Sequence, residues 1–569
     1  MRTELTELRN RMKEEGIDLY IIPTTDYHGS EYVNDHFKCR EYVSGFTGSA
    51  GTLMVQQDFA GLWTDGRYFL QAEQQLAGSG ITLMKIGEPD VPAPDEYVKR
   101  LPAESVIGFD GRIIGRRIGE ELGQRFKLRY DVDLVGDIWK ERPDIIPSAI
   151  YELPLSVTGE SREEKLKRVR AEMEDADHLL VSRLEDIAWL YDLRGRDIEN
   201  TPVFYAFALI SKTDDTLYVM DEKYRSTNGH MKVKRYSQVF DDLGRLRDCT
   251  VMLDEDSASY TVGESFDQSV KCIYRKSPVE KLKAIKNGTE IKATKAAHVR
   301  DGAAMVDFLF RLKRNIGSID ITEISLADHL EECRRERGAY DLSFSTIAGY
   351  EDHGAIVHYS ATEESNAELK AEGFVLVDSG GQYEDGTTDI TRTIALGAVE
   401  QSRKEHYTAV LKGHIALAST VFDKGTTGAE LDLVARKPLR DRGLDFNHGT
   451  GHGVGHMLSV HEGPNTISPR GKDCCILPGM ITTDEPGVYL EGMYGIRIEN
   501  ELLCIEKDGR CAFEPITFCP YEREAIDLSM LTEAEIRYIN HYHKKVYETL
   551  APLLDDDAGE WLKQQCRAL

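Results

Sequence analysis

The chain has 569 residues, of which 41% are hydrophobic and 30% are charged, and its formal net charge is -28 at pH 7. This length is too great for one ordinary hydrophobic core, and the composition is that of a folded globular protein, so several domains are expected. The acidic balance excludes non-specific nucleic-acid binding, which needs a basic surface. No apolar stretch approaches the roughly 20 residues of a membrane span. With its scattered cysteines, the chain is expected to be cytoplasmic, with reduced thiols and no membrane partner.

The N-terminal half predicts two successive α/β domains of similar fold. The chain opens with MRTELTELRNRMKEEG, in which apolar residues recur at helical spacing among charges, so an amphipathic helix is expected and not a signal peptide. Residues 1–150 and 151–285 then show the same order of elements: a charged helix, a buried strand, an acidic turn, a glycine-bearing turn and another strand. We interpret this order as a duplication. Prolines around residues 143–154 mark the first boundary.

A third domain is expected over residues 286–569. It begins with one or two long helices, and then FVLVDSGGQY and TTDITRTIAL read as two strands joined at an Asp-Gly turn. A helix follows near residues 402–422, and glycine-rich turns and short strands come after it. TEAEIRYINHYHKKVYETL predicts a C-terminal helix, which opens with a capping box of Thr532 and Glu535.

Five oxygen and nitrogen ligands in this third domain are the main functional signal. Half of the chain's 16 histidines lie between His353 and His461, several of them within NHGTGHGVGHMLSVHEGP. The candidate metal ligands are Asp378, Asp389, His452, Glu485 and Glu499. Four carboxylates and one imidazole suit two hard or borderline divalent ions that share bridging carboxylates, with one hydroxide held between them. Such a site is suited to the hydrolysis of an unreactive amide.

A plainer interpretation exists for each of these residues taken alone. Alternation along GIRIENE places Arg497 and Glu499 on one strand face, where the arginine could simply neutralise the glutamate. An acidic residue on an otherwise apolar strand is costly unless it is paired or bound to metal. A string of histidines by itself is also a weak signal. The metal-site interpretation depends on all five ligands occurring together in this order.

The motifs around these residues resemble a known superfamily. VDSG, DGTTDITRT, HGTGHGVG, VHEGP, DEPGVY and GIRIEN are similar to the motifs of the pita-bread metallopeptidases. Within that superfamily the chain resembles the Xaa-Pro aminopeptidases in their long, three-domain cytosolic form, and FTGSAGT and WTDGRYFLQAEQQL are similar to their N-terminal domain. The resemblance covers nearly the whole chain. It implies an α/β fold in which two creatinase-N-like domains precede a C-terminal pita-bread catalytic domain.

The resemblance also implies a role for each site residue. Asp378 would bind one ion, Asp389 and Glu499 would bridge both ions, and His452 with Glu485 would complete the second site. Glu485 would also be the general base for the bridging hydroxide. The residues expected to contact substrate are His358 and His461 at the carbonyl and the oxyanion, His448 beside the proline pocket, and Phe344 and Arg497 in that pocket. Manganese is the expected metal, and zinc, cobalt and magnesium are alternatives.

The implied reaction is removal of the N-terminal residue from peptides whose second residue is proline. An Xaa-Pro bond has no N–H, so it needs an apolar wall for the ring, for which Phe344 and Val357 are candidates, and strong polarisation of the carbonyl. A homodimer is implied as well. The alternatives are a prolidase acting on dipeptides, a methionine aminopeptidase, a creatinase-like relative without metals, and a non-catalytic peptide-binding protein.

Two histidines depart from the expected pattern. His456 follows the GVG run directly, and we expect a structural or supporting role for it and not a ligand role. His353 stands before Gly354, where a small polar residue is expected, so the loop around the site is predicted to differ there.

Overall fold

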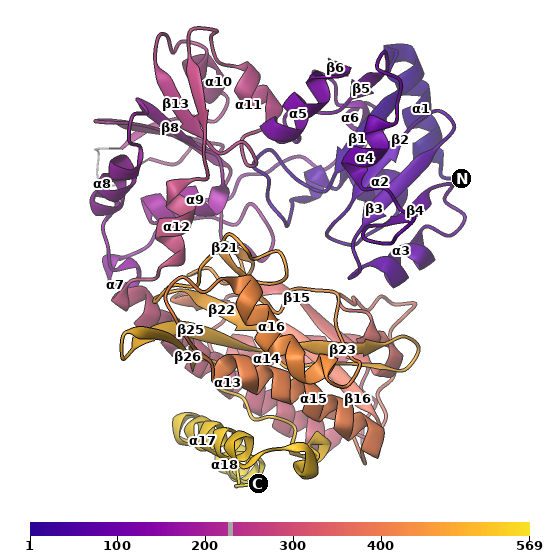
Figure 1. Cartoon of the computed structure of the whole chain (residues 1–569), viewed down its shortest axis with the longest axis vertical. Coiled ribbons are helices and arrows are strands. Elements are labelled where there is room, and N and C mark those ends of the chain that lie inside the picture. The colour runs from indigo at the N-terminus through magenta and orange to yellow at the C-terminus, as the bar shows by residue number, and fades with distance from the viewer. Residues whose placement is uncertain (226–230) are drawn as a thin grey trace. The chain divides into compact units, whose positions relative to one another are not determined.

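A computed structural model describes residues 1–225 and 231–569 of the chain. Its residues form two compact units, one made of residues 1–154 and 160–282 and the other of residues 155–159 and 283–569. Figure 1 shows the course of the chain, which passes from the first unit to the second between residues 282 and 283, within α12 (Pro278–Ala284). The predicted three-domain division at residues 150 and 285 stays a prediction.

The first unit contains two six-stranded sheets. The strands of the first sheet are β1 (Leu19–Pro23), β2 (Thr52–Val55), β3 (Ala60–Thr64), β4 (Thr82–Lys85), β5 (Val106–Gly108) and β6 (Lys127–Arg129). Those of the second are β8 (His178–Val181), β10 (Ala206–Ser211), β11 (Asp215–Val219), β12 (Lys232–Arg235), β13 (Thr250–Leu253) and β14 (Lys271–Tyr274). The helices are α1 (Thr3–Glu15), α2 (Cys39–Ser44), α3 (Phe69–Gln75), α4 (Pro94–Lys99), α5 (Arg116–Gly123), α6 (Leu134–Ile138), α8 (Arg162–Glu172), α9 (Leu184–Tyr191), α10 (Gln238–Leu243) and α11 (Tyr260–Glu264).

The two sheets share one topology. Their orders are β4-β3-β2-β1-β5-β6 and β12-β11-β10-β8-β13-β14. In each sheet the third strand of that order is antiparallel to both of its neighbours, and all other neighbouring strands are parallel. The repeat of elements predicted from the sequence is therefore confirmed. The predicted N-terminal helix is α1, which buries Leu5, Leu8 and Met12.

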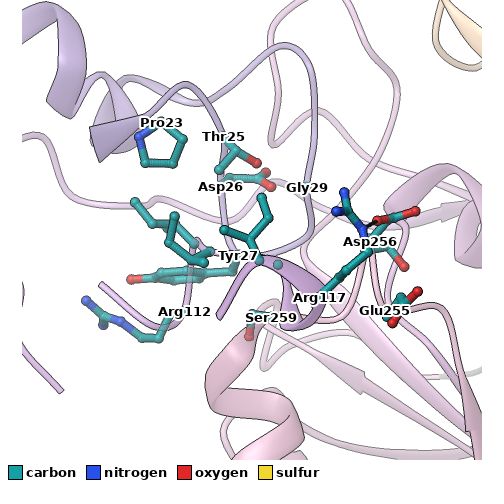
Figure 2. A pocket seen from close by; sticks show the side chains of 15 residues that line it. Pro23, Thr25, Asp26, Tyr27, Gly29, Arg112, Arg117, Glu255, Asp256 and Ser259 are labelled. Atoms are coloured by element: carbon teal, nitrogen blue, oxygen red, sulfur yellow. Dashed lines mark hydrogen bonds and ion pairs between the residues drawn. The ribbon is translucent and has the colours of Figure 1, made fainter. Parts of the chain in front are cut away.

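A cavity of about 400 Å³ lies within the first unit (Figure 2). It is lined by the loops that follow β1, β5 and β13. Its two arginines are paired with carboxylates: Arg117 Nε donates to Asp256 Oδ1 at 2.8 Å, and Arg112 Nη2 donates to Asp110 Oδ2 at 2.7 Å. Both cationic side chains of the lining are therefore already bound within the protein.

The second unit is built on two curved sheets and a short strand pair. One sheet joins β15 (Asp341–Tyr350), β16 (Phe374–Tyr383), β17 (Gly386–Thr387) and β18 (Ile390–Ala395). The other has the order β19-β26-β25-β22-β20-β21, made of β19 (Val421–Phe422), β20 (Gly451–Gly453), β21 (Glu462–Ile467), β22 (Ile481–Asp484), β25 (Asn500–Lys507) and β26 (Arg510–Pro515). The pair is β23 (Gly487–Leu490) with β24 (Tyr494–Arg497).

Helices cover the outer side of these strands. They are α13 (Gly288–Asn315), α14 (Glu323–Glu336), α15 (Gln401–Ala418), α16 (Gly428–Arg440), α17 (Glu533–Leu550) and α18 (Asp556–Gln565). In Figure 1 the helices of this unit run together beside the strands, and α17 and α18 lie beyond them. The predicted capping box of Thr532 and Glu535 opens α17. Apolar residues from α13, α15 and α17 and from the strands β16, β18, β23 and β24 form one buried core, so these strands pack against the helices.

The structure differs from the sequence prediction at the strand expected over GIRIENE. β24 ends at Arg497 and β25 begins at Asn500, so Glu499 lies between two strands and not within one. The backbone N–H of Glu499 donates to Thr391 O of β18 at 3.1 Å. The chain therefore passes from the short pair to the large sheet at this point, and that crossing turns the Glu499 side chain toward the site.

Candidate active site

The predicted ligand residues lie on strands or directly beside strand ends. Asp378 lies within β16, Asp389 directly precedes β18, and His452 is the middle residue of β20. Glu485 directly follows β22, which ends at Asp484; the predicted strand end before Pro486 is therefore present, but Gly487 already opens β23. The predicted hairpin is also present, because β16 pairs with both β17 and β18 in antiparallel register.

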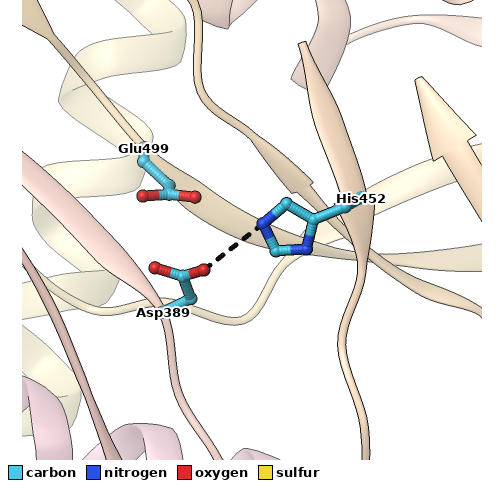
Figure 3. Close-up of side chains that lie close together, drawn as sticks. All are labelled: Asp389, His452 and Glu499. Carbon is cyan, nitrogen blue, oxygen red and sulfur yellow. Dashed lines mark ion pairs between the residues drawn. The ribbon is translucent and has the colours of Figure 1, made fainter. Parts of the chain in front are cut away.

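Three of these residues form a compact cluster (Figure 3). Asp389, His452 and Glu499 each offer one ligand atom, and these atoms all lie within 4.8 Å of one another. His452 Nε2 lies 3.4 Å from Asp389 Oδ2 and 3.6 Å from Glu485 Oε1, so the fourth residue faces the same imidazole nitrogen.

The fifth residue, Asp378, joins this cluster through an arginine and a threonine. Arg497 Nη2 donates to Asp378 Oδ2 at 2.7 Å, and Arg497 Nε donates to Thr391 Oγ1 at 3.2 Å. Thr391 Oγ1 in turn donates to Glu499 Oε2 at 2.7 Å. The ion-pair partner of Arg497 is thus Asp378 and not Glu499, which rejects the plain interpretation that Arg497 neutralises Glu499.

The carboxyl groups are held where ionisation is costly. Burial raises the pKa of Glu499 well above its usual range, and the charges of Asp389 and Asp378 raise it further. Burial raises the pKa of Glu485 to about 7. Burial also raises the pKa of Asp378, although Arg497 opposes this shift. Divalent cations would offset the repulsion within such a group.

His452 is oriented for a metal ion. Burial lowers its pKa, but the hydrogen bond to Asp389 and the charge of Glu485 outweigh that effect and raise it to about 9. Nδ1 lies 3.0 Å from Gly453 O, and because a carbonyl only accepts, Nδ1 carries the hydrogen. A pKa of about 9 means that Nε2 also holds a proton, which faces Asp389 Oδ2 at 3.4 Å. A metal ion would take the place of this proton, and an Nδ1–H fixed by a carbonyl is the usual arrangement of metal-bound histidines.

The donor set fits two divalent ions. Asp378 Oδ1 and Asp389 Oδ1 are buried and have no hydrogen-bond partner among the described residues. A buried carboxylate oxygen without a partner is costly unless a cation binds it. Four carboxylates and one neutral imidazole offer the oxygen-rich coordination preferred by hard or borderline ions.

The substrate-binding residues predicted from the sequence lie around this network. His448 Nε2 accepts a hydrogen bond from Tyr489 OH at 2.8 Å, and Tyr489 OH accepts one from Arg497 Nη1 at 2.7 Å. The His461 ring meets the His452 ring edge to face, with centroids 4.3 Å apart. His358 follows Val357, whose carbonyl accepts from Arg497 Nη2 at 3.3 Å.

Phe344 lies on β15 and pairs in register with Gly380 of β16, two residues beyond Asp378. Its side chain is nearly buried, with the residue 9% exposed. Phe344 therefore lies on the strand next to the one that carries Asp378.

Two supporting residues were missed by the sequence analysis. Tyr489 and Thr391 connect Arg497 to His448 and to Glu499, as described above. Both stand inside motifs that were noted, DEPGVY and DITRT, but motif membership does not distinguish a hydroxyl that bonds to the site from one that only packs. His456 binds Thr294 Oγ1 (3.0 Å) and Val157 O (3.2 Å), outside the ligand cluster, which agrees with a structural role.

Sequence comparisons place the chain among known proteins. The family described as "Metallopeptidase family M24" matches residues 292–506, and "C-terminal region of peptidase_M24" matches residues 509–569. "Creatinase/Prolidase N-terminal domain" matches twice, at residues 5–143 and 141–290. "Probable Xaa-Pro aminopeptidase P" of Laccaria bicolor is 38% identical over 601 residues, which cover 99% of this chain and 93% of that protein.

The chain belongs to metallopeptidase family M24.

Other relatives of this M24 chain match over the same extent. "Aminopeptidase P1" of Lotus japonicus is 37% identical to this chain, and the match covers 99% of this chain and 99% of that protein. Among solved structures, X-prolyl aminopeptidase from Caenorhabditis elegans, described as a cytosolic enzyme with a di-nuclear active site, has a TM-score of 0.95 and 32% identity over 100% of this chain and 99% of that one. Prolidase from Pyrococcus horikoshii has a TM-score of 0.52 and 26% identity over 64% of this chain and 100% of that one.

The comparisons with known proteins test the predicted fold class and the expectation of a metallopeptidase. The predicted fold class, two creatinase-N-like domains followed by an M24 catalytic domain, is confirmed. The M24 chain is a metallopeptidase whose donor set fits two divalent ions. Among residues 1–225 and 231–569, no helix is both long and apolar enough to cross a membrane.

Proposed function

We propose that this M24 chain is an Xaa-Pro aminopeptidase, which removes the N-terminal residue from peptides with proline at the second position. The observation that carries the proposal is the meeting of all five predicted ligands in one buried network. The match of the whole chain to aminopeptidases P supports this activity over that of a dipeptidase.

The proposed metal ligands are the five predicted residues, Asp378, Asp389, His452, Glu485 and Glu499. We propose manganese as the native metal, with zinc or cobalt as alternatives, because an oxygen-rich donor set favours the harder ion. Two divalent ions bound there would supply Lewis acidity to the scissile carbonyl and lower the pKa of the attacking water.

Residues of the chain would supply the general base, the hydrogen bonds to the substrate oxygen and the wall beside the proline ring. Glu485, whose Oε1 lies 3.6 Å from His452 Nε2, would take the proton from the attacking water. His358 and His461 would hold the carbonyl oxygen and the developing oxyanion. His448 would line the site next to the proline ring, held by Tyr489 at 2.8 Å.

Specificity for proline would come from the pocket of Phe344 and Arg497. The Xaa-Pro amide nitrogen has no hydrogen, so recognition cannot use an N–H donor and depends on apolar contact with the ring. Phe344 offers such a contact. Arg497 is held by Asp378 and Tyr489, which fixes one end of the pocket.

The proposal also includes a cytoplasmic location and a homodimer. The Caenorhabditis elegans enzyme with a TM-score of 0.95 is described as cytosolic, which supports the location. The homodimer follows from the family resemblance, and sedimentation of the purified protein tests it.

Product analysis by mass spectrometry tests the activity. Metal-stripped enzyme is reloaded with manganese, zinc or cobalt and given an Xaa-Pro-Yaa tripeptide, the Xaa-Pro dipeptide and an Xaa-Ala-Yaa control. We expect cleavage of the tripeptide after the first residue and an intact control. Cleavage of the dipeptide alone would instead indicate a prolidase, and no cleavage with any metal would support a peptide-binding protein.

A further inference from the structure

The start of α14 carries a buried carboxylate that gathers donors from three segments of the chain. Glu323 has a side-chain exposure of 0%. Its carboxylate accepts hydrogen bonds from the backbone N–H groups of Tyr350 at 2.8 Å and Ala367 at 3.0 Å, and from Tyr359 OH at 2.9 Å. A carboxylate with several donors is fixed in place and can anchor the groups that bind it.

His353 contacts both this carboxylate and the ring of Tyr359. Its Nδ1 lies 2.8 Å from Glu323 Oε1 and 3.1 Å from Oε2. Its ring stacks on the ring of Tyr359, with centroids 4.5 Å apart and planes 27° apart. Because Tyr359 OH also binds Glu323, the three side chains form a closed clamp that joins both ends of the segment between residues 353 and 359.

The backbone inside this clamp is closely packed, which restricts its movement. The bend begins with Ile356 N–H donating to His353 O at 3.0 Å, followed by Tyr359 N–H donating to Ile356 O at 3.1 Å. Gly354 packs against Gly495 so closely that a Cβ on Gly495 would lie 1.7 Å from Gly354 O. A Cβ on Gly349 would lie 2.8 Å from Gly354 Cα on the other side.

The clamped segment contains His358, the residue directly before Tyr359. The carbonyl before it, Val357 O, accepts from Arg497 Nη2 at 3.3 Å, and the same Nη2 donates to Asp378 Oδ2 at 2.7 Å. The segment is thus held at both ends by Glu323 and within its length by Arg497, the residue that holds a proposed metal ligand.

We infer that His353 is a positioning residue that fixes His358 for catalysis through the clamp with Glu323 and Tyr359. This inference rests on the proposed function, in which His358 holds the substrate carbonyl. Misplacing a catalytic group by about 1 Å can cost roughly 100-fold in rate, so a loosened clamp lowers kcat more than it changes KM.

Three substitutions separate the parts of the clamp. His353→Ala removes the donor and the ring, His353→Phe keeps the ring, and His353→Asn keeps an N–H near the position of Nδ1. The control is His541→Ala, which removes an exposed histidine of α17. For the manganese-loaded full-length enzyme on an Xaa-Pro-Yaa tripeptide, we expect kcat to fall about 10- to 100-fold in His353→Ala. His353→Asn should recover most of the loss, and metal content should not change.

A double substitution and amide hydrogen exchange test whether His353 acts by positioning His358. In a His358→Ala background, His353→Ala should lower kcat by less than about twofold, because the group that it positions is already gone. Amides of residues 351–359 should exchange faster in His353→Ala than in the control.

Unchanged exchange in this segment would overturn the positioning role whatever the activity. Full additivity of the two substitutions would overturn it as well. A wild-type enzyme that leaves Xaa-Pro peptides intact while His353→Ala still speeds exchange would refute the proposed function and leave the clamp standing.

Discussion

Replacing Thr391 by valine tests whether the carboxylates are oriented by the protein before metal binds. Thr391 is fully buried on β18, and its hydroxyl donates to Glu499 Oε2 at 2.7 Å while it accepts from Arg497 Nε at 3.2 Å. Valine has nearly the same shape, so the substitution removes two hydrogen bonds and leaves the packing intact.

The size of the effect follows from the charge of the acceptor. A hydrogen bond to a charged group contributes about 1.5–3 kcal/mol, and its loss leaves Glu499 and Arg497 each short of one partner. Since about 1.4 kcal/mol corresponds to a factor of ten, metal affinity should fall roughly 10- to 100-fold. Loss of an outer hydrogen bond to a metal ligand typically has this size.

The assay is competition for manganese between the protein and a chelator of known affinity, followed by metal analysis. Thr408→Val is the matched control, because Thr408 is also fully buried but its hydroxyl accepts from Asp527 N–H at 2.8 Å, away from the ligands. We expect weaker metal binding in Thr391→Val alone and near-normal kcat at saturating metal. Equal affinities for Thr391→Val and the wild type would refute the idea that this hydroxyl orients Glu499.

Three further predictions follow from the same contacts. Asp389→Ala or Glu499→Ala should abolish turnover and lower metal content, as measured by metal analysis of the purified variants, because each removes a carboxylate proposed to bridge both ions. His461→Ala should cut turnover severely and keep both metals; a variant that lost its metals would instead make His461 part of the metal site. In the first unit, burial lowers the pKa of His28 to about 3, so its unfolded form binds a proton below about pH 6.5 and its folded form does not. The free energy of unfolding should therefore fall by up to about 1.4 kcal/mol per pH unit between pH 6.5 and 4, and urea titrations of His28→Phe should show a shallower fall.

Much of the fold was predictable because local patterns and topology agreed. The hairpin of β16 and β18 follows from its Asp-Gly turn, and α17 begins at its capping box of Thr532 and Glu535. The repeated order of elements in the first half also appears as the same strand order in both sheets. For the hairpin and the cap, the information lies within a few residues of sequence, where turn and cap chemistry act.

The contacts that join distant segments were not predictable in this way. Alternation suggested a single strand through Glu499, but the chain changes sheets there, because Glu499 N–H bonds to Thr391 O across more than a hundred residues of sequence. The partner of His353 was hidden for the same reason, since Glu323 lies at the start of α14, 30 residues earlier. Sequence spacing shows which residue types are present but does not show which side chains meet.

Arg497 joins the proposed proline pocket to the proposed metal ligands. Its guanidinium donates to Asp378, to Thr391 and to the hydroxyl of Tyr489, and that hydroxyl also donates to His448. A guanidinium presents its donors in one rigid plane, so a shift of the arginine moves all of its partners together. A side chain that pressed on the proline pocket would therefore also displace a carboxylate of the metal site. In the proposed site, substrate fit and metal geometry would be coupled by contact, because the group proposed to shape the pocket also holds a proposed ligand.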